Sequence, residues 1–174
     1  DGYSVEWSTH SNQIDLETGK IYHDNTENNV VLSAYISDKS SEVPVVIMAG
    51  GKGTRLYPYT KILPKPLIPI GDVPIMERII DKFRDAGVEN FYATVNYRKS
   101  MIKSYFNDQM IDYKMCYVEE NKPLGTAGSL KLIPDRFDKP FIVTNCDILI
   151  HADYSDIYKY HQESGNELTI VSAL

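Results

Sequence analysis

The sequence predicts an α/β fold in three layers, with a mostly parallel β-sheet covered by helices on both faces. From Val43 onward, apolar segments typical of strands alternate with segments whose apolar residues recur at helical spacing. The strand segments are nearly continuous apolar runs, which is typical of strands buried on both faces of a parallel sheet. Strands that alternate with helices in this way favour right-handed crossovers between parallel neighbours.

The predicted elements follow one another in a regular order. "VPVVIMAG" at 43–50 is the first strand, and glycine ends it. "VPIMERIIDKFRDAG" at 73–87 is a helix, because Pro74 suits its first turn and Gly87 suits the position after its last turn. We expect further strands at 90–96, 113–120, 140–150 and 167–174, and further helices at 99–108, 126–133 and 153–164.

Residues 1–42 differ from the rest of the chain. They are rich in Ser, Asn, Asp, Glu and Thr, with a hairpin or turn expected around Gly19 and one strand expected within 29–36. We interpret them as an extension, a linker or the tail of an upstream module, and 43–174 as a separate domain. The chain begins without methionine and stops within a strand-like segment, so we expect a fragment truncated at its C-terminus.

Composition excludes several classes of function. A formal net charge of −6 argues against nonspecific binding to nucleic acid and against docking on anionic lipid. Two cysteines are too few for a disulfide framework, and free thiols predict a reducing, cytoplasmic location. We find no apolar run of membrane-spanning length and no visible signal peptide. The sequence leaves assembly into a homo-oligomer open.

The stretch "MAGGKGTRLYPYTKILPKP" follows the first strand and combines glycines with two cations. Gly50, Gly51 and Gly53 let backbone N–H groups approach phosphate oxygens, although glycines alone fit a plain turn equally well. Arg55 offers a planar fork of donors for phosphate oxygens. Lys65 stands between two prolines that stiffen the backbone, whereas an isolated "PKP" would favour a solvated lysine. Together these residues predict a phosphate-binding loop.

Two later motifs fall at the same predicted sheet edge, where parallel sheets bind their ligands. Asp147 follows a buried strand and could hold Mg²⁺, although "NCD" alone would favour a turn or a cap. In "EENKPLGTAGS", Gly125 would let a flat ligand approach the backbone, and Glu119 and Glu120 offer acceptors. Guanine presents two adjacent donors that suit a carboxylate, which favours guanine weakly over uracil or thymine.

The glycine, arginine and lysine signature, followed in order by "PLGTAGS" and "NCDIL", resembles the sugar-phosphate nucleotidylyltransferases. The resemblance runs from about Val43 to Leu174 and implies the N-terminal, nucleotide-binding part of a Rossmann-like catalytic domain. It implies that a sugar 1-phosphate attacks the α-phosphorus of a nucleoside triphosphate and that pyrophosphate leaves. Such reactions are catalysed mainly by positioning and by charge stabilisation.

Roles carry over from this resemblance by position. Arg55 would stabilise charge on the leaving pyrophosphate, Lys65 would bind phosphates near the reacting centre, and Asp147 would hold the Mg²⁺ cofactor. The nucleotide would be bound by Ala49, Gly50, Gly51, Gly53, Thr54, Glu120, Gly125 and Thr126. Transfer to another phosphate, such as phosphocholine, and a catalytically incomplete fragment that only binds nucleotide sugars remain as alternatives. A dinucleotide dehydrogenase fits poorly, because its fingerprint is absent.

Overall fold

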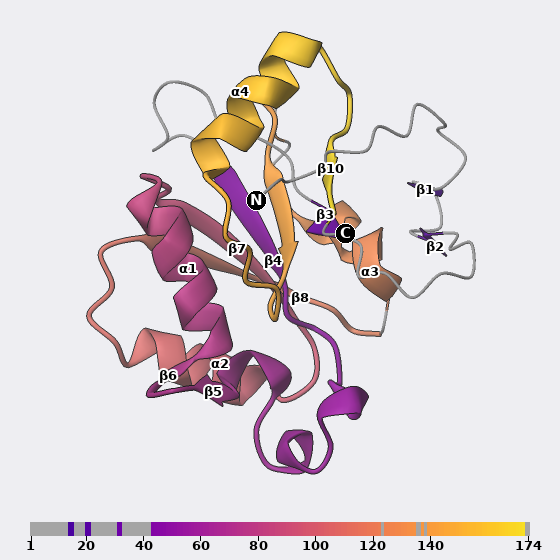
Figure 1. Ribbon diagram of the computed structural model, residues 1–174. Coiled ribbons are helices and arrows are strands. Elements are labelled where there is room, and N and C mark those ends of the chain that lie inside the picture. Colours follow the sequence, from indigo (N-terminus) through magenta and orange to yellow (C-terminus); the bar gives the residue numbers. More distant parts are fainter. Residues whose placement is uncertain are drawn as a thin grey trace.

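A four-stranded parallel sheet forms the centre of the computed structural model (Figure 1). The structure describes residues 43–172 except 123, 135, 136 and 138, together with three short strands nearer the N-terminus. The sheet has the order β8–β7–β4–β9, so the chain adds two strands on one side of β4 and then places β9 on the other. Such a reversal is the point where open α/β sheets bind ligands. The strands are β4 (Pro44–Met48), β7 (Asn90–Val95), β8 (Lys114–Glu119) and β9 (Ile142–Asn145).

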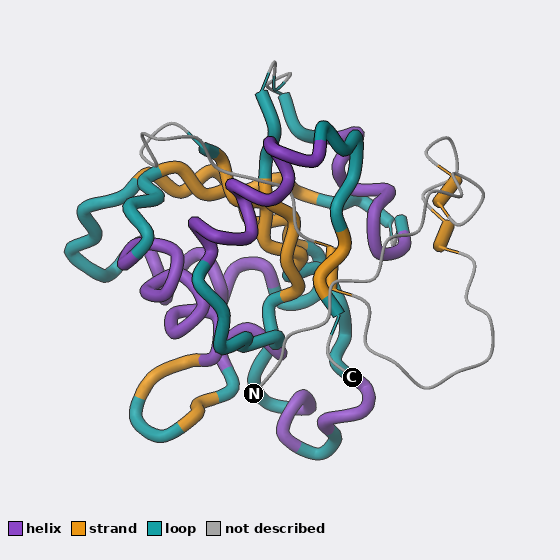
Figure 2. The backbone as a smooth tube through the Cα atoms, turned by 45° about the horizontal axis from the view of Figure 1, so that its top comes forward, coloured by secondary structure: helices purple, strands orange, loops and turns teal. Residues whose placement is uncertain are grey.

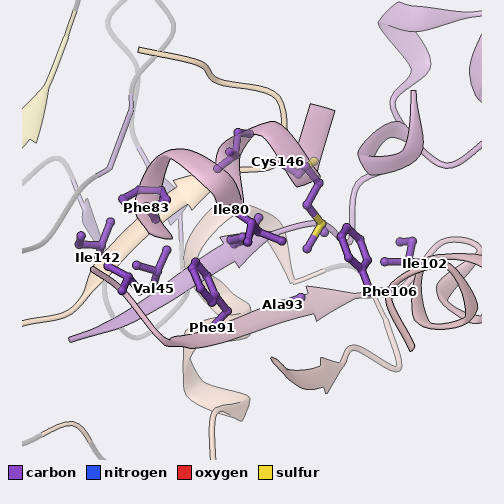
Figure 3. Packing of buried hydrophobic residues seen from close by; sticks show 14 of the residues in the cluster. Val45, Ile80, Phe83, Phe91, Ala93, Ile102, Phe106, Ile142 and Cys146 are labelled. Carbon is purple, nitrogen blue, oxygen red and sulfur yellow. The ribbon is translucent and has the colours of Figure 1, made fainter. Parts of the chain in front are cut away.

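Alternating side chains of the central strand β4 face two different layers, because successive residues of a strand point to opposite faces. Val45 and Ile47 belong to the larger core, which also contains fully buried residues of α1 and α2 (Figure 3). Val46 lies in a second, smaller core with Val143. Burying one such side chain stabilises the fold by about 1.5–3 kcal/mol. The larger core also includes Ala49, Leu67 and Cys146, so it joins the sheet to the segments at its carboxyl edge.

Helices cover both faces of the sheet (Figures 1 and 2). The larger core includes buried residues of α1, α2 and α4, and the smaller core is covered by the 3-10 helix η6 and by β10 (Ile170–Val171). The three longer helices are α1 (Ile75–Asp85), α2 (Lys99–Asn107) and α4 (Tyr154–Ser164). The short ones on the other side are α3 (Gly125–Gly128) and η6 (Ser129–Leu132). The predicted three-layer α/β fold is confirmed.

The segment between β4 and α1 contains short elements that the sequence did not predict. Three 3-10 helices follow the glycines, and a small antiparallel hairpin then leads into α1. Pro74 is the residue before α1 and Gly87 follows its end with a φ of 86°, as expected from the sequence. The new elements are η3 (Thr54–Leu56), η4 (Tyr59–Lys61), η5 (Lys65–Leu67), β5 (Pro69–Ile70) and β6 (Val73–Pro74).

The predicted strand at 167–174 does not join the parallel sheet. Its described part, β10 (Ile170–Val171), pairs antiparallel with β3 (Val31–Leu32). The expectation of a fifth parallel strand was wrong, because an apolar run does not specify its pairing partner. Near the N-terminus, β1 (Ile14–Asp15) and β2 (Lys20–Ile21) form the hairpin expected around Gly19. Among the described residues, no helix has the length and apolar character needed to cross a membrane.

Candidate nucleotide site

Three motifs begin at one edge of the sheet, because the strands that precede them are parallel. A backbone hydrogen bond to a neighbouring strand fixes the first residue after each of these strands. Ala49 N donates to Thr94 O at 2.9 Å, which leaves the glycines to start immediately beyond β4. Glu120 N donates to Val95 O at 2.9 Å in the same way beyond β8. Cys146 N, one residue before Asp147, donates to a backbone oxygen of β4 at 3.3 Å. The carboxyl ends of three strands therefore present the predicted residues on a common edge.

The three glycines of the loop differ in their surroundings. A Cβ added to Gly50 would lie 2.6 Å from Glu120 Oε1, so the Glu120 carboxylate packs directly on this glycine. Gly53 has a φ of 63°, and an added Cβ would lie 3.0 Å from Lys65 Cβ. Gly51 has nothing within 4 Å of an added Cβ. Two glycines thus allow close contacts within the protein, whereas the third borders open space.

Lys65 and Asp147 form an ion pair, with Nζ and Oδ2 2.5 Å apart. Lys65 is the first residue of η5, and both prolines beside it are buried. Asp147 follows β9, the neighbour of β4. The side chains are 21% and 31% exposed, so the pair is partly shielded yet open to a ligand. This contact brings together two of the predicted phosphate-site residues.

Cys146 lies beside this pair and is buried. Burial raises the pKa of its thiol to about 12, with Asp147 acting in the same direction and Lys65 opposing it. The thiol is therefore protonated at neutral pH, and only the thiolate is an effective nucleophile. Cys146 is a packing residue, in agreement with a reaction that needs no covalent enzyme intermediate.

Thr54 and Arg55 lie in η3 and are exposed. Within the described part of the chain, no hydrogen bond or ion pair joins either side chain to Lys65 or Asp147. Arg55 is two residues after Gly53, so the loop carries it near the same edge. The guanidinium is thus exposed, and among the described residues none of its five donors has a hydrogen-bond or ion-pair partner.

The two glutamates after β8 have different environments. Glu119 is exposed and accepts from Lys99 Nζ at 2.5 Å and from Lys103. These hydrogen bonds, Lys103 first, lower the pKa of its carboxyl to about 2. Glu120 is 7% exposed and contacts Gly50 of the loop. Of the two, only Glu120 has its carboxylate beside the glycines.

The loop after Glu120 leads to α3, which contains the other two predicted nucleotide residues. Gly125 begins this helix with a φ of 79°, a conformation that favours glycine. Thr126 is the next residue of the helix, and its side chain lies outside the described part of the structure. No hydrogen bond or ion pair among the described residues joins Gly125 to the glycine loop, so its place in the site rests on the sequence motif alone.

Sequence reasoning missed a group of polar residues immediately after β7. Asn96 Nδ2 donates to Glu120 O at 2.9 Å and so fixes the chain that carries this carboxylate. Tyr97 and Arg98 contact the backbone of the glycine-containing loop. "VNYR" stands at the carboxyl end of a predicted parallel strand, the edge where such sheets bind ligands. That position could have marked these residues as candidates for the site.

The model of the "Nucleotidyl transferase" family matches residues 44–174. The chain belongs to the nucleotidyl transferase family. The resemblance to sugar-phosphate nucleotidylyltransferases drawn from the motifs is therefore confirmed.

Two similar fungal proteins carry the same name. The chain is 38% identical over 133 residues to a mannose-1-phosphate guanyltransferase of Aspergillus oryzae, covering 72% of this chain and 36% of that protein. It is 35% identical over 132 residues to the protein of the same name from Saccharomyces cerevisiae, covering 73% and 37%. The chain therefore spans little more than a third of the length of these relatives.

Several solved structures share the fold of this chain. HddC from Yersinia pseudotuberculosis matches with a TM-score of 0.59 and 32% identity, over 68% of this chain and 54% of that chain. A further HddC structure, complexed with GMP-PN, matches with a TM-score of 0.57 at the same identity and coverage. UDP-glucose pyrophosphorylase from Acinetobacter baumanii, at 19% identity and a TM-score of 0.60 over 71% and 53%, shows the fold alone.

The donor set of the described residues fits a metal held partly by substrate. Among the described residues, no group of three or more His, Cys, Asp or Glu side chains could enclose a metal ion by itself. Asp147 offers a single, partly exposed carboxylate beside the phosphate loop. Mg²⁺ is commonly bound by one or two carboxylates together with substrate phosphates and water. Asp147 therefore fits Mg²⁺ as one carboxylate ligand beside substrate phosphates.

Proposed function

We propose that the protein transfers a nucleotidyl group from a nucleoside triphosphate to a sugar 1-phosphate, giving a nucleotide sugar and pyrophosphate. The observation that carries this proposal is the ion pair of Lys65 with Asp147 beside Gly53, at the reversal point of the sheet. A cation, a carboxylate and a glycine turn at that point form a suitable environment for a metal-bound triphosphate.

The reaction forms one bond and breaks another at the α-phosphorus. A phosphate oxygen of the sugar 1-phosphate bonds to this atom, and the bridging bond to the β-phosphate breaks, with its electron pair leaving on pyrophosphate. Lys65 would hold the phosphate oxygens near the reacting atom, and Arg55 would stabilise charge on the leaving group. Neither residue transfers a proton or forms a covalent bond, so both act through position and charge.

The glycine loop, with the backbone of Ala49 and Thr54 at its ends, would hold the triphosphate. The space beside Gly51 would admit phosphate oxygens to the backbone. Gly125 and Thr126 would flank the base and ribose. Asp147 would hold Mg²⁺, which when bound neutralises phosphate charge.

Guanine is the base that we propose, and Glu120 is its proposed acceptor. Two observations on similar proteins support this choice: the named relatives are guanyltransferases, and an HddC structure is described as complexed with GMP-PN. The Glu120 carboxylate, packed on Gly50, could accept from the two adjacent donors of guanine. Mannose 1-phosphate is the proposed sugar substrate, on the names of the relatives.

We also propose the organisation of the chain. Residues 43–174 would form the nucleotide-binding part of the transferase domain, which is supported by a family match that begins at residue 44. Residues 1–42 would be an extension or the tail of another module. A cytoplasmic location and a homo-oligomeric assembly remain proposals of the same kind.

A substrate panel tests the proposed function. The full-length gene product is incubated with Mg²⁺, one of GTP, UTP, CTP, ATP or dTTP, and mannose 1-phosphate, glucose 1-phosphate or phosphocholine, and pyrophosphate release is measured. Fastest release with GTP and mannose 1-phosphate is the expected result. If pyrophosphate is released only with phosphocholine, the acceptor is phosphocholine and not a sugar 1-phosphate. If the protein binds nucleotide sugars but releases no pyrophosphate with any substrate, it is a binding protein and not a transferase.

A further inference from the structure

Arg98 occupies an unusual backbone position between β7 and α2. It precedes the first residue of α2 with a φ of 52°, and among the described residues it is the non-glycine residue with a positive φ. Side chains other than glycine, asparagine and aspartate rarely adopt this conformation. The backbone conformation at this position does not favour arginine, so the contacts of the guanidinium are needed to explain why an arginine stands there.

Those contacts reach the loop that follows the glycines. Arg98 Nη2 donates to Lys61 O at 2.8 Å, and Nε donates to Tyr97 Oη at 2.9 Å. The third nitrogen, Nη1, lies 3.6 Å from Met101 Sδ, and the guanidinium carbon lies 5.4 Å from the centre of the Tyr97 ring. Every nitrogen of this guanidinium is therefore engaged within the protein.

The contacts continue from η4 to the glycine turn. Tyr97 Oη donates to Thr60 O at 3.3 Å, so Tyr97 and Arg98 bind successive carbonyl groups of η4. Thr60 is 5% exposed, and its Oγ1 donates to Gly53 O at 3.0 Å. Gly53 in turn packs on Lys65, which pairs with Asp147. An unbroken series of contacts thus joins Arg98 to the proposed phosphate site.

We propose that Arg98 is a positioning residue for the nucleotide loop. With Tyr97, it fixes η4 against the end of β7, and so holds the Gly53 turn and Lys65 in place before a triphosphate binds. The inference rests on the proposed function of that loop and deepens it. Holding the loop in its binding conformation reduces the ordering cost that the ligand would otherwise meet.

The alternative role, a direct phosphate ligand, better suits a guanidinium whose donors are all unused. Arg55 is such a group among the described residues, whereas Arg98 already uses three of its five donors, one on each nitrogen, within the protein. Arg98→Lys separates the two roles. A lysine keeps the positive charge but cannot hold two acceptors with a rigid fork.

The first experiment measures loop order in the full-length gene product by hydrogen–deuterium exchange without substrate. Arg98→Gly suits the positive φ and removes the guanidinium, and Tyr97→Phe removes the hydroxyl alone. Both should accelerate exchange of the backbone amides at 53–67 and leave the β4 amides protected. Unchanged exchange at 53–67 in both variants would overturn the proposal, as would acceleration spread over the whole domain.

The second experiment measures GTP affinity by calorimetry with the same proteins. Arg98→Gly should weaken binding about tenfold, the equivalent of one lost hydrogen bond to a charged group, and Arg98→Lys should not restore it. Full affinity in Arg98→Lys would assign the residue to direct charge attraction instead. If the unmodified protein binds no nucleotide, the proposed function fails, while hydrogen exchange still decides the positioning role.

Arg84→Ala is the matched control for these variants. Arg84 also lies over a tyrosine ring, with its guanidinium carbon 5.5 Å from the centre of Tyr113, and it pairs with Asp112. It stands in the last turn of α1, at the opposite end of that helix from the nucleotide loop. Losing it should leave both the exchange at 53–67 and the affinity for GTP unchanged.

Discussion

Lys65 Nζ lies 2.5 Å from Asp147 Oδ2, although the two residues are distant in the sequence. They meet because β4 and β9 are hydrogen-bonded neighbours whose chain direction is the same, so the segments that follow them leave the sheet together. The pair is partly exposed, and a pair in such a setting contributes little to stability. Its position at the carboxyl edge of the sheet, where parallel sheets bind ligands, is the reason for proposing a function in binding.

Asp147→Asn should remove the dependence of nucleotide binding on metal. Asparagine keeps the size of the side chain but loses the negative charge with which the proposed carboxylate ligand would attract Mg²⁺. Calorimetry with GTP, in Mg²⁺ and then in EDTA, should show stronger binding with the metal in the unmodified protein and equal binding in the variant. Asp153→Asn is the control, since Asp153 accepts from Ser155 N as the cap of α4 and asparagine can do the same. A metal effect that persists in Asp147→Asn would assign the metal elsewhere.

Lys65→Met and Arg55→Ala should each reduce turnover while the fold survives. Both cations are proposed to act on phosphate charge, and removing one such group typically costs about 3–4 kcal/mol, or 10²–10³ in rate. Pyrophosphate release by the full-length gene product gives the rate, and circular dichroism checks the fold. Lys82→Met on α1 is the control. Near-normal turnover in either loop variant would contradict the assigned role.

The parallel sheet and its edge could be predicted because their signals are local. Apolar runs ended by glycine or by a polar residue mark β4, β7, β8 and β9, and the edge follows from parallel topology. The sequence predicted that Lys65 and Asp147 lie at the same edge of the sheet, but not that they form an ion pair. The contact itself depends on η5 and its buried prolines, whose geometry no periodicity reveals.

Other features depend on tertiary contacts and could not be predicted in this way. The pairing of β10 with β3 joins segments that local pattern treats as unrelated. Glu119 and Glu120 are adjacent and identical in sequence, yet one binds two lysines and the other packs on Gly50. Strand alternation places them on opposite faces, but the partners are known only from the fold.

The three glycines should respond differently to alanine. Gly53→Ala should be the most disruptive, because its positive φ and its contacts with Lys65 and Thr60 both oppose a Cβ. Gly50→Ala should fold and displace the flexible end of Glu120. Gly51→Ala meets nothing within the protein, so any loss of GTP affinity there reports close approach of the ligand itself. Melting temperatures and calorimetry separate the three cases, and normal affinity in Gly51→Ala would exclude contact at that residue.

Glu119 should titrate far below an ordinary glutamate. Hydrogen bonds from Lys103 and Lys99 lower the pKa of its carboxyl from 4.5 to about 2. A lowered pKa in the folded state means that the contribution of this cluster to stability is complete above pH 4.5 and is lost as the pH falls through 2. Carbon-13 titration of the carboxyl measures the value directly, and Lys103→Met should raise it. A pKa of 4.5 in the unmodified protein would show that the two lysines do not hold Glu119 in solution.

Glu120→Gln should change the choice of base, and Glu119→Gln should not. The carboxylate of Glu120 is buried against Gly50 beside the nucleotide loop, whereas that of Glu119 is exposed and bound by lysines. Replacing a carboxylate acceptor with an amide leaves a donor of guanine poorly matched, which should cost about 1–3 kcal/mol of preference for GTP. Relative kcat/KM values for GTP and UTP in the full-length gene product measure this preference. If both variants show the same ratio of kcat/KM for GTP to kcat/KM for UTP, Glu120 does not recognise the base. The backbone around Gly125 would then be the proposed determinant of base preference.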